Sequence, residues 1–326
     1  MREELLKLPK IELHLHLDGS MSLSVAKKIS NLPDDVLRKK MIAPDKCNNL
    51  SEYLTKFDFT TSLMQTKKNL SLIATDLSDY LKRQNVIYAE VRFAPMFHTR
   101  NGLSYDEIIT SILEGFDKNS HPKVNLILCL MRGADDNDNW KTVEVAKKYL
   151  HKGVCAIDLA GAEDKYPLTP YLKFFEKARE EGIPFTIHAG ENGEASEVEK
   201  AIMVGAKRIG HGIHAINDTS VMRALRDKNV LLEVCPTSNV QTNAIDTYAN
   251  HPIKKLYDEG ISVSINTDNR IVSNIELVDE YLKLSKYFAF TLDDYKKMNI
   301  EACKHAFISD KEKNELLREL NSQEKI

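Results

Sequence analysis

Two histidines one residue apart near the N-terminus are the first side chains that could do metal chemistry. They lie in residues 11–19, read I-E-L-H-L-H-L-D-G, where apolar and polar residues alternate with the period of a β-strand. His14 and His16 therefore project from one face of the predicted strand, and imidazole nitrogens suit zinc or a similar divalent ion. The alternative is a plain polar face on an edge strand, since histidine has many structural uses.

Other polar residues stand where further predicted strands end. They are Asp18, Asp158, Gly161, His188, Glu191, His211, Cys235 through Asn239, Asp268 and Asn269. The remaining histidines fall in predicted loops or helices, where surface or packing roles are expected: His98, His121, His151, His214, His251 and His305. The strand-end residues are therefore the candidates for a functional site.

These residues need elements to position them, and short strands alternate with helices along most of the chain. Strands are predicted at 11–19, 85–93, 123–132, 153–159, 183–188, 207–211, 229–234 and 261–268. Helices are predicted at 106–116, 143–150, 276–287, 293–305 and 310–320, with another that has Thr169 as N-cap, Pro170 at its first position and Gly182 at its end. Alternating strands and helices predict a parallel sheet, and eight units predict a closed (β/α)8 barrel, whose catalytic residues sit at the C-terminal strand ends.

Alternation within the strands predicts which side chains point into the barrel. In 183–188 and 261–268 the bulky apolar residues share one face, so they should face the helices and leave His188 and Asp268 inward. Strands one and eight are neighbours in a closed barrel, which places Asp268 beside His14 and His16. Three imidazoles and a carboxylate suit zinc with room for an activated water. A two-metal site would want a bridging Lys or Glu after strand four, but D-L-A-G stands there, so one metal ion is favoured.

The long segment between the first two strands, at about 20–84, is predicted to be a helical insertion or lid. Residues 51–70 carry a helical pattern in which Leu54, Phe57 and Phe59 either line a pocket for a flat ring or pack onto the body of the fold.

Composition limits the class of protein. A chain of 326 residues with 42% hydrophobic content is expected to form a single barrel domain over 1–326. A net charge of -3, with 45 basic and 48 acidic residues, argues against a nucleic-acid partner. Five scattered cysteines indicate reduced thiols, and neither a signal peptide nor a membrane span is recognised. We expect a cytoplasmic protein that acts on a small molecule, with its oligomeric state left open.

The motifs taken together resemble the adenosine deaminase family. They are P-K-I-E-L-H-L-H-L-D-G-S at 9–20, D-L-A-G-A-E at 158–163, H-A-G-E at 188–191, G-H-G-I-H at 210–214, C-P-T-S-N at 235–239 and N-T-D-N at 266–269. They follow the family's order and span nearly the whole chain. Any one of them is weak, whereas six in order at predicted strand ends are specific.

The resemblance implies a set of roles. One zinc ion per chain would be bound by His14, His16, His188 and Asp268. His211 would orient or deprotonate the zinc-bound water, and Glu191 would protonate purine N1 so that C6 is attacked and ammonia leaves. The implied substrate-binding residues are His16, Asp18 (ribose 5′-hydroxyl), Gly161 (its N–H to N3) and Asn269.

Two of these residues bear on the substrate. The Asp18 carboxylate accepts a hydrogen bond from a 5′-hydroxyl but repels a 5′-phosphate, and related adenine deaminases tend to carry glutamate there. Asn269 stands where the family often has a second acid, and its amide donates to purine N7 without needing an extra proton. Adenosine and 2′-deoxyadenosine are therefore the expected substrates. Asp18 and Glu191 also have a structural alternative. Asp18 could be a cap or turn residue before Gly19, and Glu191 could be an acid at a helix N-terminus, where the helix dipole favours it.

Other functions stay open at this point. The chain could deaminate adenine or a 5′-modified nucleoside instead. A different mononuclear amidohydrolase would open a cyclic amide and release no ammonia from adenosine. An inactive metal-binding family member would lack Glu191 or His211, and both are present.

Overall fold

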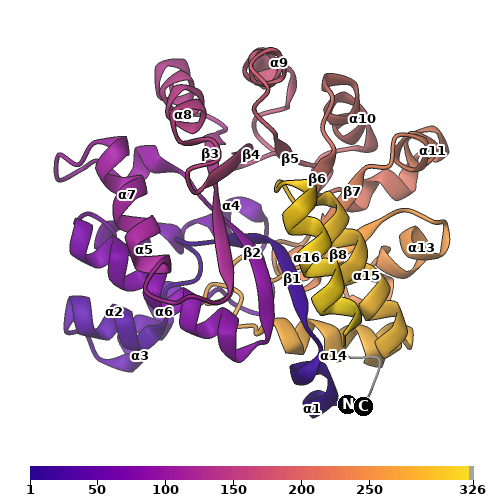
Figure 1. Cartoon of the computed structure of the whole chain (residues 1–326), viewed down its shortest axis with the longest axis horizontal. Coiled ribbons are helices and arrows are strands. Elements are labelled where there is room, and N and C mark those ends of the chain that lie inside the picture. The colour runs from indigo at the N-terminus through magenta and orange to yellow at the C-terminus, as the bar shows by residue number, and fades with distance from the viewer. Residues whose placement is uncertain (323–326) are drawn as a thin grey trace.

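Strands at the centre and helices around them build a barrel (Figure 1). The computed structural model describes residues 1–322. In this part of the chain the eight strands are β1 (Lys10–His16), β2 (Val86–Phe93), β3 (Lys123–Met131), β4 (Val154–Ala160), β5 (Thr186–Ala189), β6 (Arg208–His211), β7 (Leu231–Val234) and β8 (Val263–Ile265). Every pairing is parallel, and the strands run in sequence order within two four-stranded sheets, β1 to β4 and β5 to β8.

Backbone hydrogen bonds join the two sheets at both edges. Between β4 and β5, the N–H of Ile157 donates to the carbonyl of Pro184 at 3.1 Å. On the other side, the N–H of Asp268 donates to His14 at 3.0 Å and the N–H of His16 donates to Asp268 at 2.7 Å. The ring of strands is therefore closed, and the predicted (β/α)8 barrel is confirmed.

Helices cover the outside of this ring. They are α1 (Arg2–Lys7), α2 (Leu23–Ser30), α3 (Asp34–Met41), α4 (Leu50–Leu54), α5 (Phe57–Leu63), α6 (Lys67–Arg83), α7 (Tyr105–Phe116), α8 (Asp136–Tyr149), α9 (Leu172–Glu180), α10 (Ala195–Val204), α11 (Thr219–Asp227), α12 (Pro236–Gln241), α13 (Ile253–Asp258), α14 (Leu277–Phe288), α15 (Leu292–His305) and α16 (Asp310–Asn321). The segment α2 to α6 lies between β1 and β2, where the helical insertion is predicted. Helices α14 to α16 follow the last strand (Figure 1).

Apolar side chains on the outer face of the strands form the main core with these helices. Ile187 of β5 and Val263 and Ile265 of β8 are buried in it, as their alternation predicts. Each such side chain stabilises the fold by roughly 1.5–3 kcal/mol relative to an exposed one. The opposite face of the same strands is therefore left to point into the barrel.

The helix expected to begin at Thr169 starts differently. Residues Thr169–Tyr171 form a 3-10 turn, and α9 begins only at Leu172. Leu168 is already helical (φ -64°, ψ -31°), and its N–H is bonded at 2.6 Å to Glu197 on the neighbouring α10. The prediction of Thr169 as N-cap is wrong because this tertiary contact fixes the entry of the chain one residue earlier.

The pattern at 51–70 is broken into α4, α5 and the start of α6. Hydroxyl side chains compete for the backbone there: Thr55 bonds the carbonyl of Glu52 and Thr61 that of Phe57, each at 2.7 Å. Thr66 then caps α6 by accepting from the N–H of Asn69. One long helix is thus replaced by short ones that can curve over the barrel.

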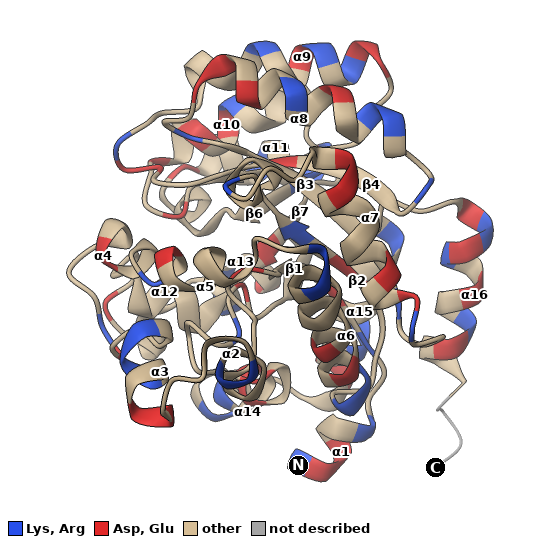
Figure 2. Cartoon of the chain, turned by 90° about the vertical axis from the view of Figure 1, so that its left-hand side faces the viewer, with Lys and Arg blue, Asp and Glu red and all other residues tan. Residues whose placement is uncertain are grey.

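Charged side chains of both signs are interspersed over the surface helices, without one dominant basic face in the view of Figure 2. Within residues 1–322, no helix is both long and apolar enough to cross a membrane.

Candidate active site

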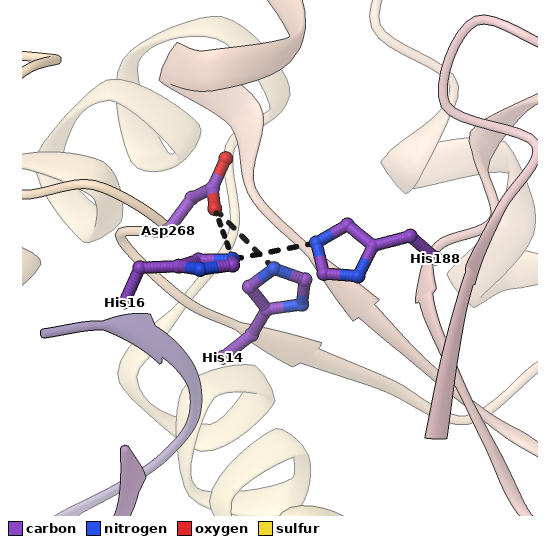
Figure 3. A group of neighbouring side chains, drawn as sticks. All are labelled: His14, His16, His188 and Asp268. Carbon is purple, nitrogen blue, oxygen red and sulfur yellow. Dashed lines mark hydrogen bonds and ion pairs between the residues drawn. The ribbon is translucent and has the colours of Figure 1, made fainter. Parts of the chain in front are cut away.

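Four side chains from three strand ends converge at one rim of the barrel (Figure 3). His14 and His16 come from β1 and His188 from β5. Asp268 follows β8 in a left-handed conformation (φ 58°), and its backbone is hydrogen-bonded to β1 on both sides. This bend directs the carboxylate toward the two histidines, as the sequence predicts. All four side chains are buried.

Distances among these four residues fit a tetrahedral metal ion. Oδ1 of Asp268 lies 3.3 Å from Nε2 of His14 and 3.3 Å from Nε2 of His16. Nε2 of His16 lies 3.4 Å from Nε2 of His188. Zinc–ligand bonds of about 2.0–2.1 Å separate tetrahedral ligand atoms by about 3.3–3.4 Å. The donor set therefore has the spacing that one zinc ion requires.

Electrostatics also favour a cation at this position. Nε2 of His14 is buried without a hydrogen-bond partner among residues 1–322. Burial alone would raise the pKa of Asp268, but His14 and His16 hold it well below its usual range, while burial lowers the pKa of His16. An ionised carboxylate and a neutral imidazole are the forms that bind metal. His14, His211, Cys235 and Asp268 form a second possible group, but burial raises the pKa of the Cys235 thiol, so its thiolate is disfavoured.

Next to this group, a chain of hydrogen bonds sets the proton position on His211. The N–H of Ile253 donates to Nδ1 of His251, so the proton of His251 is on Nε2, 3.2 Å from Oδ1 of Asn239. The Asn239 amide therefore turns its NH2 to Nδ1 of His211, at 3.0 Å. His211, whose pKa is lowered by burial, consequently carries its proton on Nε2. That Nε2 lies 3.7 Å from Oε2 of Glu191.

Glu191 sits at the start of a loop that one buried carboxylate organises. Glu163 accepts from four consecutive backbone N–H groups, those of Gly190, Glu191, Asn192 and Gly193, at 2.7–3.1 Å. Burial, and then the charges of Asp268 and Glu163, raise the pKa of Glu191 well above its usual value. The raised pKa favours the protonated acid form of Glu191.

The remaining predicted substrate residues surround the same space. Asp18 is buried, and burial raises its pKa to about 7. Gly161, at φ 105°, ends β4 in a conformation that favours glycine. Asn269 lies against Gly19, where a Cβ would come within 2.1 Å of the amide oxygen. Glycine after Asp18 thus makes room for Asn269, a reason that the sequence pattern does not reveal.

A cavity of about 310 Å³ opens over this group. Its walls include His16, His188 and Asp268 on one side and Leu54 and Phe57 of the segment between β1 and β2 on the other. Phe59 packs against the main core instead. Of the two expected outcomes, lining the pocket or packing onto the body of the fold, Phe59 has the second. The volume is at the lower end of the range for small-molecule sites.

Sequence patterns bring the metal group together but do not reveal the residues behind it. Glu163 appears only as a letter of a motif, Asn239 is a strand-end candidate without an assigned role, and Glu233 and Arg92 belong to none of the motifs. The one available signal is charge inside strands: Glu90 and Arg92 of β2 and Glu233 of β7 are charged residues among mostly apolar neighbours, and all three are fully buried.

Comparison with known proteins agrees with this architecture over nearly the whole chain. Residues 9–323 match the family model described as adenosine deaminase. The chain is 39% identical over 324 residues to an adenosine deaminase of Clostridium perfringens (strain 13 / Type A), covering 96% of this chain and 98% of that protein.

Solved structures of the same fold are similar as well. Adenine deaminase from Arthrobacter aurescens has a TM-score of 0.87 at 25% identity, over 97% of this chain and 98% of that one. An amidohydrolase from Burkhoderia ambifaria, solved with bound zinc, has a TM-score of 0.87 at 21% identity, over 99% and 92% of the two chains.

Proposed function

Because the chain belongs to the adenosine deaminase family of purine-deaminating hydrolases, we propose that it hydrolyses adenosine and 2′-deoxyadenosine to inosine and deoxyinosine with release of ammonia. One observation carries the proposal: three of the four candidate metal ligands (His16, His188 and Asp268) and Glu191, an acid whose pKa is raised, line the same cavity. The first suits activation of water and the second suits protonation of a ring nitrogen.

A zinc ion bound by these four residues would lower the pKa of a coordinated water to about 7 and so supply a nucleophile at neutral pH. Its ligand spacing and the ionised Asp268 support zinc, with one ion per chain.

Protein groups carry the proton steps. Glu191 donates its proton to purine N1, which makes C6 electrophilic, and the oxygen of water adds to C6. One proton of that water leaves with the amino group as ammonia, and the other restores the acid form of Glu191. His211 donates Nε2–H to the oxygen of the attacking water, so it orients this water. Deprotonation by His211 is disfavoured, because Asn239 occupies the lone pair of Nδ1 and leaves the proton on Nε2.

Substrate contacts follow from the residues on the cavity wall. The N–H of Gly161 donates to purine N3 and the Asn269 amide to N7. Above its pKa of about 7, the Asp18 carboxylate accepts from the ribose 5′-hydroxyl and repels a 5′-phosphate, which favours a nucleoside over adenine or a nucleotide. His16 borders both the metal group and the cavity. The segment α4–α5 contributes an apolar wall. Its closure as a lid stays a prediction. The organisation of 1–326 as a single domain also stays a prediction.

The partners and compartment are part of the same proposal. The substrates are a small purine nucleoside and water, without nucleic acid or membrane as a partner. All five cysteines are buried free thiols, which agrees with the reducing cytoplasm as the site of action.

The test is ammonia release by zinc-loaded protein on adenosine, 2′-deoxyadenosine and adenine in parallel. Activity on the two nucleosides alone is expected. Activity on adenine alone would keep the metal chemistry and overturn the ribose contact of Asp18. Absence of ammonia from all three would exclude adenosine deamination and direct the search to 5′-modified nucleosides.

A further inference from the structure

Behind the candidate metal group, ion pairs join five buried charged side chains that we call the buried charge cluster. They are Glu90 and Arg92 of β2, Asp158 of β4, Arg208 of β6 and Glu233 of β7, and all are 0% exposed. Buried charges are costly unless they are paired and hydrogen-bonded, so a cluster of this size needs an explanation.

Two carboxylates of the cluster face the rear nitrogens of two predicted metal ligands. Oε2 of Glu233 lies 2.9 Å from Nδ1 of His14, and Oδ2 of Asp158 lies 2.9 Å from Nδ1 of His188. The Nε2 atoms of the same rings point to the metal position. A carboxylate behind a ligating imidazole fixes its orientation and makes it a better ligand.

One guanidinium connects these two carboxylates. Arg92 donates from NH1 to Oδ2 of Asp158 and from NH2 to Oε2 of Glu233, both at 2.8 Å. NH2 also donates to the carbonyl of Leu13, the residue before His14, at 2.5 Å. A guanidinium is a rigid planar fork, so the two carboxylates are held at a fixed separation. His14 on β1 and His188 on β5 are thereby tied through one side chain.

We propose that Arg92 is a positioning residue that couples the orientations of His14 and His188, so that the two histidines bind the metal ion as one unit. The inference rests on the proposed metal centre. It adds that the position of the carboxylate behind His14 and the position of the carboxylate behind His188 depend on each other through Arg92.

The experiment is a double-variant cycle on zinc affinity, measured by competition with a chelator. Glu233→Gln and Asp158→Asn keep the shape of each side chain and remove the charge behind one histidine. Each should weaken zinc binding about 10- to 100-fold. Because either change already breaks the coupling through Arg92, the double variant should lose less than the product of the two single losses.

Glu90→Gln is the matched control. Glu90 is as buried as Glu233 and is paired with Arg208 at 2.5 Å, but its contacts are Arg208, Tyr88 and the N–H of Phe307, remote from the two rear nitrogens. Glu90 reaches Glu233 only through Arg208, whose Nε donates to Oε1 of Glu233 at 2.7 Å, so Glu90→Gln should weaken zinc binding much less than Glu233→Gln does. Cobalt(II) provides a second readout, since its visible spectrum should change in Glu233→Gln and Asp158→Asn but not in Glu90→Gln.

Three outcomes would overturn the proposal. Multiplicative losses in the double variant would show that the histidines are held independently. An equal loss in Glu90→Gln would show a general packing effect. If the unaltered protein binds neither zinc nor cobalt, the metal centre and this inference fail together, whereas metal binding and ammonia release with multiplicative losses overturn this inference alone. Should a carboxamide variant not fold, Arg92→Lys keeps the charge without the fork and should show the same loss.

Discussion

Glu191 must hold a proton at neutral pH if it is to protonate a purine nitrogen. Its pKa is raised by burial and by Asp268 and Glu163, so its acid form persists to higher pH than that of an ordinary glutamate and is lost as pH rises through the raised value. Replacing the acid by an amide of the same shape keeps hydrogen bonding but removes the transferable proton. We predict that Glu191→Gln lowers kcat by about 10²- to 10⁴-fold with zinc affinity unchanged.

Steady-state ammonia release and chelator competition measure the two quantities. Glu194→Gln, on the exposed part of the same loop, is the control and should behave as the unaltered protein. Near-normal turnover of a zinc-loaded Glu191→Gln variant would remove Glu191 from the mechanism.

Glu163 gives a pH prediction with a defined sign. Its charge contributes to the raised pKa of Glu191, and its four backbone contacts hold the loop. Glu163→Gln removes that charge, so the pKa of Glu191 should fall and its acid form should be lost at a lower pH. The alkaline limb of the kcat profile should therefore move to lower pH. An unmoved limb would mean that another group produces it.

The proton position on His211 is testable without a turnover assay. The chain Ile253–His251–Asn239 places the proton on Nε2. Asn239→Asp offers only acceptors, so it should draw the proton to Nδ1 of His211. Nitrogen-15 NMR on histidine-labelled protein distinguishes the two tautomers. The same tautomer in both proteins would contradict donation from the Asn239 amide to His211.

At the scale of elements, the sequence predicts what depends on local alternation. Strands and their inward faces are recognisable because apolar side chains repeat with period two, and this places His188 and Asp268 correctly. The prediction for Thr169 is wrong because a distant contact, Leu168 with Glu197, sets that helix start. Arg92 and Glu233 are not predicted, because the partner that pairs with a buried charge lies on another strand and cannot be identified from the local pattern. Local pattern thus predicts the ligands, and tertiary structure supplies their supports.

Glycine at 210 shows how closely elements approach at the site. A Cβ on this β6 residue would lie 3.0 Å from Cε1 and 3.3 Å from Nδ1 of His14. Gly210→Ala should displace the imidazole by a few tenths of an ångström and disturb its contact with Glu233. We predict weaker zinc binding, measured by chelator competition, with a small change in Tm.

Gly115→Ala is the matched substitution away from the site. Its Cβ would come within 2.4 Å of the carbonyl oxygen of Ser71, where α7 packs on α6. It should destabilise the protein by about 1–3 kcal/mol through overpacking and leave zinc affinity unchanged. If Gly210→Ala and Gly115→Ala have the same profile, the steric argument at His14 is wrong.

For the molecule as a whole, a bound metal ion would make metal binding and folding interdependent. The carboxylates of Asp158, Glu233 and Asp268 lie beside the candidate metal-binding histidines, and like charges repel most strongly where water is excluded. A bound divalent ion would offset this repulsion and join β1, β5 and the turn after β8. A site with free zinc at 100 times its Kd stabilises the folded state by about 2.7 kcal/mol.

Removal of the metal should consequently lower Tm by about 5 °C. In a protein of a few hundred residues, a change of 1 kcal/mol in the free energy of unfolding shifts Tm by about 2 °C. Thermal unfolding followed by circular dichroism, with and without a chelator, measures the shift, and added zinc should reverse it. His16→Gln removes one ligand and should make Tm insensitive to the chelator. An inactive Glu191→Gln variant should respond in the same way, because Glu191 is not one of the four candidate metal ligands. If the Tm of the unaltered protein is the same with and without the chelator, the folded barrel does not need a cation to offset its buried negative charge.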